Sequence, residues 1–186
     1  MNLVCFTEEQ SAKEMLDIIL PKLISGTSYQ IIHFEGKQDL EKNIGLKLKN
    51  WCTPDTVFLI TRDQDSGDCQ TIKQDLLTKI NHAGKKDVSL VRIACRELES
   101  FYLGDWQAVK QGLKLSKVPN QANRKYRNPD NLANAKEELI KYTNKIYQPI
   151  SGSKLISPYL KLDGSNKSTS FNFLLSGITK LCTTKP

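Results

Sequence analysis

The alternation of short strand-type runs with helical patterns over the first hundred residues is the feature that most constrains the fold. Apolar residues recur at helical spacing between the strand candidates, and residues 56–61 form the near-continuous apolar run of a strand covered on both faces. The order βαβαβαβ is typical of a parallel sheet with right-handed crossovers and flanking helices. We therefore expect a Rossmann-like α/β sheet of about four strands. The strand candidates are residues 3–7, 29–34, 56–61 and 88–94.

Three helices are expected between these strands. Ser11 and Glu14 have the spacing of a capping box, which predicts that the first helix begins at Ser11. Pro21 is expected to bend or end that helix. The apolar positions that mark the three helices are Met15, Ile19 and Leu23; Leu40, Ile44 and Leu48; and Ile72, Leu76, Leu77 and Ile80.

From residue 105 onward the strand pattern gives way to short helical patterns. We divide the chain into an α/β core over residues 1–104 and a basic helical extension over residues 105–186, packed together as one compact unit. The extension either caps the sheet or forms a small lobe. Residues 114–131, with two prolines and four asparagines, predict a long basic loop. Short helices are expected at 105–113, 132–146, 153–160 and 171–181.

The positive charge lies almost entirely in this extension. Through Gly104 the chain has 13 Lys and Arg against 15 Asp and Glu, whereas from Asp105 it has 14 against 5. A basic surface attracts phosphate backbones or anionic membranes, although it is equally typical of an ordinary solvated face. The charge therefore makes a polyanion, nucleic acid above all, a candidate partner.

Membrane and secretory classes fit the sequence poorly. No apolar run approaches the roughly 20 residues that a bilayer-spanning helix needs, and the start lacks the pattern of a signal peptide. We expect a cytoplasmic protein that does not enter a membrane. Five cysteines without a CxxC pair, together with only two histidines, favour reduced thiols over a zinc ribbon or a disulfide framework.

Acidic residues follow three of the four strand candidates. Ligands of open parallel sheets bind beyond the carboxyl ends of the strands, so these acids are expected at one edge. Extended backbone points residues i and i+2 the same way, which predicts Asp63 beside Asp65 and Glu97 beside Glu99. Clustered carboxylates repel one another unless a cation neutralises them, and oxygen ligands suit Mg²⁺ or Mn²⁺. The acids are Glu8, Glu9, Asp63, Asp65, Asp68, Glu97 and Glu99.

Structural roles compete with the metal hypothesis. Asp68 is placed to cap the helix that contains Ile72, and Glu9 is equally suited to a solvated position. A DxD pair alone is a weak motif. An EF-hand loop would need Gly and Glu where the chain has Asp68 and Gln74. The sequence also has no GxxxxGK[ST] phosphate loop, no GxSxG turn and no activated Cys–His signature.

The three acidic strand ends together resemble the Toprim catalytic domain. The stretches that carry the resemblance are VCFTEEQS, FLITRDQDSGDC and VRIACRELESFYLGD, with EGKQDLE, SGSKLISPYL and SNKSTSFNFLL extending it over nearly the whole chain. The chain resembles a family of small bacterial Toprim-like proteins of unassigned function, related to the overcoming-lysogenization-defect class of nucleases. This resemblance implies a Toprim-like sheet and Mg²⁺-dependent phosphodiester chemistry.

The resemblance also implies roles for individual residues. Glu8 matches the first-strand Glu, a metal ligand or general acid/base, and Asp63 and Asp65 match the DxD that holds Mg²⁺. Glu97 and Glu99 stand where nuclease-type members add acids for a second ion, an arrangement that suits in-line displacement. One departure is Glu9, where many Toprim domains have Gly. A strand-passing topoisomerase is excluded because it needs a transesterifying Tyr on a much larger scaffold.

Several basic residues are candidates for phosphate contacts. Cations stabilise the charge that develops in phosphoryl chemistry, although any single one is as well explained by a solvated surface. Tyr126, within the basic loop, is a candidate for base stacking, whereas Phe101, Tyr102 and Trp106 are expected in the core. The basic candidates are Arg62, Arg96, Arg124, Lys125, Arg127, Lys154 and Lys167.

We therefore expect a metal-dependent endonuclease or related phosphodiesterase that acts on DNA in preference to RNA. The resemblance implies work in phage defence with a separate ABC-type or AAA-type ATPase. The alternative is a non-catalytic Toprim-like subunit that regulates or recruits such a partner. A receiver-like phosphotransfer domain fits less well, because acids follow the fourth strand. Convergence of Glu8, Asp63, Asp65 and one of Glu97 or Glu99 beside a basic groove favours the nuclease, and dispersed acids favour the subunit.

Overall fold

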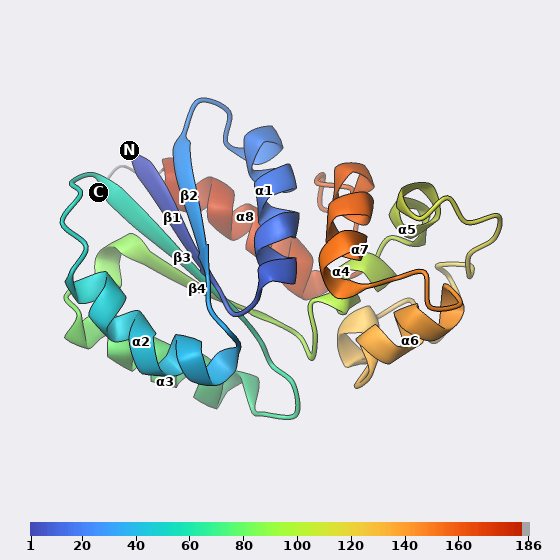
Figure 1. The fold of residues 1–186 in the computed structure, drawn as a ribbon, viewed down its shortest axis with the longest axis horizontal. Helices are drawn as coiled ribbons and strands as arrows, with labels where there is room; N and C mark the ends of the chain where they lie inside the picture. The colour runs from blue at the N-terminus through green and yellow to red at the C-terminus, as the bar shows by residue number, and fades with distance from the viewer. Residues whose placement is uncertain (184–186) are drawn as a thin grey trace.

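The computed structural model describes residues 1–183 and contains a four-stranded, all-parallel sheet (Figure 1). Its strands are β1 (Asn2–Thr7), β2 (Ser28–His33), β3 (Thr56–Asp63) and β4 (Ser89–Ala94), in the spatial order β2-β1-β3-β4. The register pairs Cys5 of β1 with Ile31 of β2 and with Leu59 of β3. The expected α/β fold is confirmed, and each strand end lies within two residues of its prediction.

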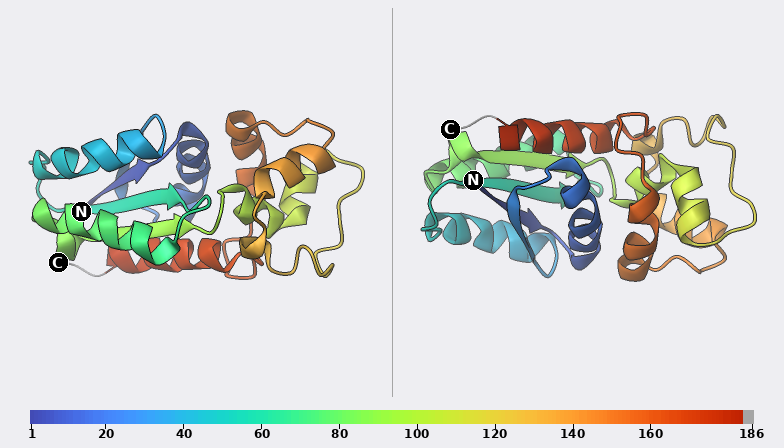
Figure 2. Two further views of the ribbon diagram at one scale, coloured as in Figure 1. Left: turned by 90° about the horizontal axis from the view of Figure 1, so that it is seen from below. Right: turned by 90° about the horizontal axis from the view of Figure 1, so that it is seen from above.

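Helices cover both faces of the sheet. One face carries α1 (Gln10–Leu23) and α8 (Thr169–Thr183), and the other carries α2 (Lys37–Lys49) and α3 (Cys69–His82), as the two views of Figure 2 show. Side chains of β1 alternate between the two cores, with Leu3 in one and Val4 in the other. Because both faces are buried, β1 and β3 consist of almost uninterrupted apolar residues.

The direction of strand addition reverses between β1 and β3. From β1 the chain passes through α1 to β2 on one side, and it then crosses back through α2 to β3 on the other. Doubly wound sheets bind their ligands beyond the carboxyl ends of the strands at such a switch point. The fold therefore directs attention to the residues that follow β1 and β3.

A helical lobe lies beyond the carboxyl ends of the strands (Figure 1). It contains α4 (Glu99–Leu103), α5 (Trp106–Gly112), α6 (Ala135–Tyr142) and α7 (Pro149–Ile156). Three short 3-10 turns complete the described elements: η1 (Lys86–Val88) before β4, and η2 (Pro129–Asn131) and η3 (Ser157–Tyr159) in the lobe. The lobe shares a continuous apolar core with α1 and α8, into which Trp106 and Tyr147 are buried. The extension thus both covers the sheet, through α8, and forms a lobe.

The loop over residues 114–131 is irregular up to η2, as expected. Gln121 anchors this loop to the lobe. Its amide nitrogen donates to the carbonyls of Leu103 at 3.0 Å and Tyr126 at 2.8 Å, and its oxygen accepts from the N–H of Trp106 at 3.0 Å. The loop is therefore fixed to the lobe near its centre.

The predicted start of α1 is wrong by one residue. Glu9 is the N-cap, and the hydroxyl of Ser11 donates to the Glu9 carboxylate rather than capping the helix. The helix passes through Pro21 and ends nearby at Leu23. The helix expected at 132–146 spans only Ala135–Tyr142, and α4 lies where no helix is predicted.

Two further observations bear on the class of protein. Among residues 1–183 no helix has both the length and the apolar character required to span a bilayer. All five cysteines are free thiols, although only Cys5 is fully buried. The other four thiols are partly or fully exposed.

Candidate functional site

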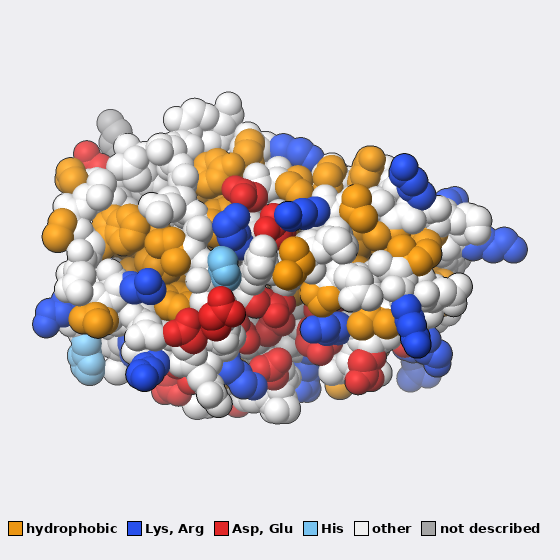
Figure 3. Space-filling view, in the orientation of Figure 1, with side chains coloured by type: hydrophobic (Ala, Val, Ile, Leu, Met, Phe, Trp, Pro, Cys, Tyr) orange, Lys and Arg blue, Asp and Glu red, His pale blue; other side chains and the backbone are white. Residues whose placement is uncertain are grey.

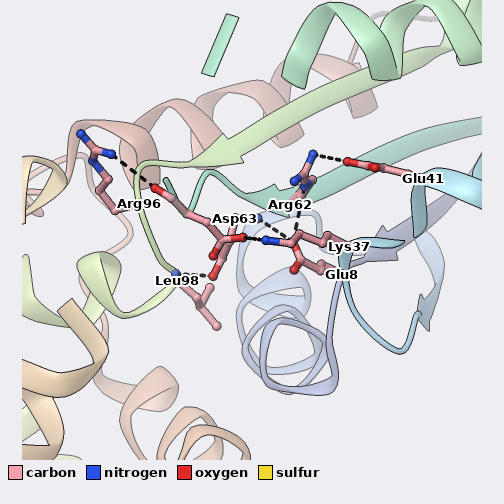
Figure 4. Close-up of polar contacts among 8 residues, drawn as sticks. Glu8, Lys37, Glu41, Arg62, Asp63, Arg96 and Leu98 are labelled. Carbon is pink, nitrogen blue, oxygen red and sulfur yellow. Dashed lines mark hydrogen bonds and ion pairs between the residues drawn. The ribbon is translucent and has the colours of Figure 1, made fainter. Parts of the chain in front are cut away.

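The side chains of Glu8 and Asp63 lie together at the switch point (Figure 4). Glu8 directly follows β1, and Asp63 is the last residue of the neighbouring strand β3. The backbone N–H of Asp63 donates to Oε2 of Glu8 at 3.0 Å. The Asp63 carboxylate in turn accepts from the N–H of Leu98 at 3.1 Å. Parallel pairing of β1 with β3 therefore brings together the two acids that the sequence ranks first.

Burial and repulsion disfavour the charged forms of both acids. Burial raises the pKa of Asp63 well above its ordinary value, and the nearby carboxyls of Glu99 and Glu8 raise it further, against a smaller lowering effect of the Leu98 hydrogen bond. Burial also raises the pKa of Glu8, and the hydrogen bond from Asp63 opposes this shift. Within residues 1–183 no basic side chain forms an ion pair with Asp63. Asp63 is an acid that its surroundings leave without a neutralising charge.

Two cations neutralise the acids around this pair. The Arg62 side chain, only 9% exposed, is ion-paired with Glu41, and its Nε lies 3.8 Å from Oε2 of Glu8. Lys37, at the start of α2, contacts Oδ2 of Asp65 at 2.8 Å. Arg62 is thus a buried positioning residue for Glu8, which corrects the expectation that it clamps a phosphate.

The extended backbone that the i, i+2 argument assumes ends before Asp65. Asp65 has φ 53° and Arg96 has φ 64°, because the backbone leaves the extended conformation as β3 and β4 end. The N–H of Asp65 donates to the Arg96 carbonyl at 2.7 Å, and Nη1 of Arg96 donates to the Asp65 carbonyl at 3.4 Å. The Asp65 side chain contacts Lys37. Arg96 is partly exposed, and its expected phosphate contact stays a prediction.

Glu97 and Glu99 also have separate partners. Oε2 of Glu97 accepts from the N–H of Lys136 in the first turn of α6 at 2.8 Å. Glu99, 2% exposed, accepts from the hydroxyl of Tyr147 at 2.9 Å, and burial raises its pKa to about 7. The prediction that these two side chains lie together is wrong because α4 begins at Glu99, and helical backbone does not align residues i and i+2.

The five predicted metal ligands therefore do not form one cluster. Among residues 1–183 no three His, Cys, Asp or Glu side chains are placed to hold one ion. The pair Glu8 and Asp63 still fits a hard divalent cation in its chemistry, because both groups supply oxygen donors and Asp63 lacks a cationic partner. Proteins commonly hold Mg²⁺ by one or two carboxylates, with water and substrate phosphates as the other ligands.

The remaining predicted phosphate contacts divide into two groups. Lys125 pairs with Glu138 at 2.7 Å, and Lys154 pairs with Glu14 at 3.5 Å, so acids of the chain already neutralise both. The other three side chains are exposed: Arg124, Arg127 and Lys167. The second group differs from the first in having no ion pair within residues 1–183.

Tyr126 is a core residue, so its assignment as a base-stacking residue is wrong. It is 4% exposed, its hydroxyl donates to Glu138 at 2.6 Å, and its ring meets Trp106 edge to face. The expected burial of Phe101, Tyr102 and Trp106 is confirmed.

Lys37 and Arg92 are two candidate functional residues that the sequence analysis does not identify. Lys37 lies four residues after β2, so the carboxyl-end rule that selected the acids also applies to it. Arg92 interrupts the apolar β4, and its Nε donates to the Phe173 carbonyl at 2.9 Å. The signal in the sequence that could have identified Arg92 is a cationic residue within an otherwise apolar strand.

A small pocket of about 20 Å³ adjoins the acid pair. Glu8 and Asp63 line it together with Met15 of α1, Arg92 of β4 and Leu174 of α8. In the space-filling view acidic side chains gather near the middle of one face, with basic side chains around them (Figure 3). Glu8 and Asp63 therefore line a pocket and lie at the carboxyl-end edge of the sheet.

The comparisons with other proteins place the chain in a family without assigning it an activity. No curated protein and no solved structure matches it. Residues 7–179 match a family described as a domain of unknown function, DUF4276. This match runs from the last residue of β1 into α8 and so includes the acidic edge and the lobe. The chain therefore belongs to the DUF4276 family.

Proposed function

We propose that the chain is a Mg²⁺- or Mn²⁺-dependent nuclease or related phosphodiesterase of the Toprim type, with Glu8 and Asp63 as its central acids. One observation carries the proposal: the Asp63 carboxyl, at the switch point, lies near two other carboxyls and has no ion pair within residues 1–183. A carboxylate that serves only stability is normally paired so that its pKa falls, whereas that of Asp63 rises. Such acids in a cleft are typical of functional sites.

The residues around the acid pair have different roles in the proposed reaction. Glu8 and Asp63 provide the ligands, and a divalent ion bound by them supplies a polarised phosphate and an activated water. Arg62 and the N–H of Asp63 hold Glu8 in place. Lys37 neutralises Asp65 at the same edge, which reduces the negative charge that a substrate phosphate would meet there.

DNA is the proposed substrate, ahead of RNA. The excess of basic residues after Gly104 supports a polyanionic partner, as does the exposure of Arg124, Arg127 and Lys167. The proposed partner protein is a separate ABC-type or AAA-type ATPase acting in phage defence, which rests on the Toprim resemblance and on the missing phosphate loop. Five free thiols support a reducing cytoplasm as the compartment.

Cleavage of plasmid and single-stranded DNA with Mg²⁺ or Mn²⁺ tests this proposal. The variants are Glu8→Gln and Asp63→Asn, which keep the size of each side chain and its ability to accept a hydrogen bond. Asp87→Asn, at an exposed position in η1, is the matched control. Each protein is assayed alone and with any ATPase encoded beside it. We expect cutting by the wild type and the control, and a loss of at least a hundredfold in both site variants.

The alternative is a non-catalytic Toprim-like subunit that binds or regulates an ATPase. Two observations favour it: the carboxylates do not form a three-ligand cluster within residues 1–183, and Asp65 is already neutralised by Lys37. Cleavage that survives both site substitutions, or no cleavage under any condition, would leave this subunit role in place of the nuclease.

A further inference from the structure

A second, larger groove runs along β4, the edge strand of the sheet. It has a volume of about 550 Å³ and lies between β4, the first turns of α3 and α8, and the η2 segment. Arg92, Ile93 and Ser170 line both this groove and the pocket beside Glu8 and Asp63. The groove therefore adjoins the candidate active site.

Two cations without counter-ions line the groove. Lys73 and Arg92 form no ion pair within residues 1–183. Arg92 is half-buried, and burial alone lowers its pKa, because no acid compensates its charge. A partly desolvated guanidinium without a carboxylate partner favours an external anion.

An exposed aromatic ring lies at the same groove. Phe173 on α8 is 60% exposed, although its helix buries Phe171, Leu174 and Leu175 against the core. Its backbone carbonyl is fixed by Arg92, so the ring is presented from a rigid helical position. An exposed ring beside phosphate-attracting cations is the arrangement by which proteins stack the bases of single strands.

The other polar residues of the groove are compatible with this ligand. Gln70, Asn128 and Asn131 provide uncharged donors and acceptors. Asp130 is the one acid in the groove lining, and its oxygens accept from Ser168 Oγ at 2.6 Å and Ser170 N–H at 2.8 Å. These hydrogen bonds at the start of α8 offset its charge.

We infer that the β4 groove binds a single-stranded nucleic acid, with phosphates near Lys73 and Arg92 and a base stacked on Phe173. A duplex keeps its bases paired and stacked on one another, so it cannot offer a free base to the ring. The inference rests on the proposed function for the strand's role as substrate, because the groove leads to Glu8 and Asp63. Binding itself requires neither acid.

Fluorescence anisotropy with a labelled 12-nucleotide oligothymidylate, in EDTA so that no cleavage occurs, tests the inference. We expect Phe173→Ala to weaken binding by about tenfold or more, and Lys73→Ala to reduce the salt dependence by about 0.7 in the log–log slope. Phe173→Trp should keep the affinity, and the indole fluorescence should fall on binding. The controls are Leu46→Ala, 61% exposed on α2, and Lys49→Ala, exposed on the same helix.

The outcomes separate this inference from the proposed activity. No binding by the wild type, wild-type affinity in Phe173→Ala, or equal competition by a blunt duplex would each overturn the groove assignment. Equal competition by single-stranded RNA would support it, since stacking does not distinguish the sugars. If the oligonucleotide binds as expected but no DNA is cut with Mg²⁺ or Mn²⁺, the groove stands and the nuclease proposal fails.

Discussion

The hydroxyl of Tyr147 donates a 2.9 Å hydrogen bond to Glu99, and the charge of this buried carboxyl helps to raise the pKa of Asp63. Tyr147 and Glu99 belong to the helical lobe, whereas Asp63 ends the central strand β3. The lobe therefore acts on the switch point electrostatically, in addition to burying apolar surface against α1 and α8. Glu99 thus raises the pKa of Asp63 and does not lie with Glu97 in one ligand pair.

Glu99→Gln is expected to remove a pH-dependent loss of stability. The pKa of Glu99 rises from an ordinary value of 4.5 to about 7 on folding, so between these values the folded state binds more protons than the unfolded chain. The free energy of unfolding therefore falls as the pH rises through this window, by on the order of 3 kcal/mol from this group, and then levels off. Gln can still accept from Tyr147 but cannot ionise.

Urea unfolding between pH 4.5 and pH 8 measures this difference. The slope of stability against pH should decrease in Glu99→Gln and persist in Glu137→Gln, a control at an exposed position on α6. Equal slopes in Glu99→Gln and the wild type would show that Glu99 titrates normally.

Asp63→Asn should stabilise the metal-free protein while removing its activity. Because burial and two carboxyls raise the pKa of Asp63, the ionised form costs folding free energy at neutral pH. Asn can still accept from the N–H of Leu98, and we expect a gain of about 1 kcal/mol or more at pH 8 in EDTA. Mg²⁺ should then stabilise the wild type in thermal unfolding but not the variant. A lower free energy of unfolding in Asp63→Asn than in the wild type would show that the Asp63 carboxyl stabilises the fold.

Arg62 and Lys37 should differ sharply in their effect on stability, although each contacts an acid of the same edge. Arg62→Met leaves Glu41 and Glu8 without their buried cation, and breaking such a pair costs roughly 3–5 kcal/mol. Lys37→Met removes a pair whose side chains are 48% and 37% exposed, which is worth less than about 1 kcal/mol. Chemical unfolding of the two variants gives the comparison. Equal losses of unfolding free energy in Arg62→Met and Lys37→Met would show that the ion pairs of Arg62 stabilise the fold no more than an exposed pair does.

The parts of the fold that the sequence predicts are those fixed by local pattern. Residues 56–61 form a strand because a run of apolar residues suits a doubly covered sheet, and Asp68 caps α3 because its partner, the N–H of Thr71, is three residues away at 2.8 Å. The pairing of Glu8 with Asp63 follows in turn from parallel strands with common carboxyl ends.

The parts that the sequence does not predict depend on backbone turns and distant partners. Asp65 has a positive φ and is paired with Lys37, which an extended-strand argument does not anticipate. Glu99 is bonded to Tyr147, 48 residues later, and Arg62 to Glu41, 21 residues earlier. Nothing in local spacing identifies these partners, because each lies in another part of the fold.

Tyr126→Phe distinguishes a core role from a nucleic-acid contact in the basic loop. The Tyr126 hydroxyl donates to Glu138, which is also paired with Lys125, and Trp106 covers the ring. Removing the hydroxyl takes a hydrogen bond from a charged, largely buried acceptor, so we expect a loss of about 1.5–3 kcal/mol in urea unfolding. Tyr159→Phe, at a position 49% exposed, should change stability little. Oligonucleotide affinity should be the same in both variants, because the Tyr126 hydroxyl is bonded to Glu138 and its ring is buried, so neither contacts a nucleic acid. A weaker affinity for the oligonucleotide in Tyr126→Phe, with unchanged stability, would show that Tyr126 contacts the nucleic acid.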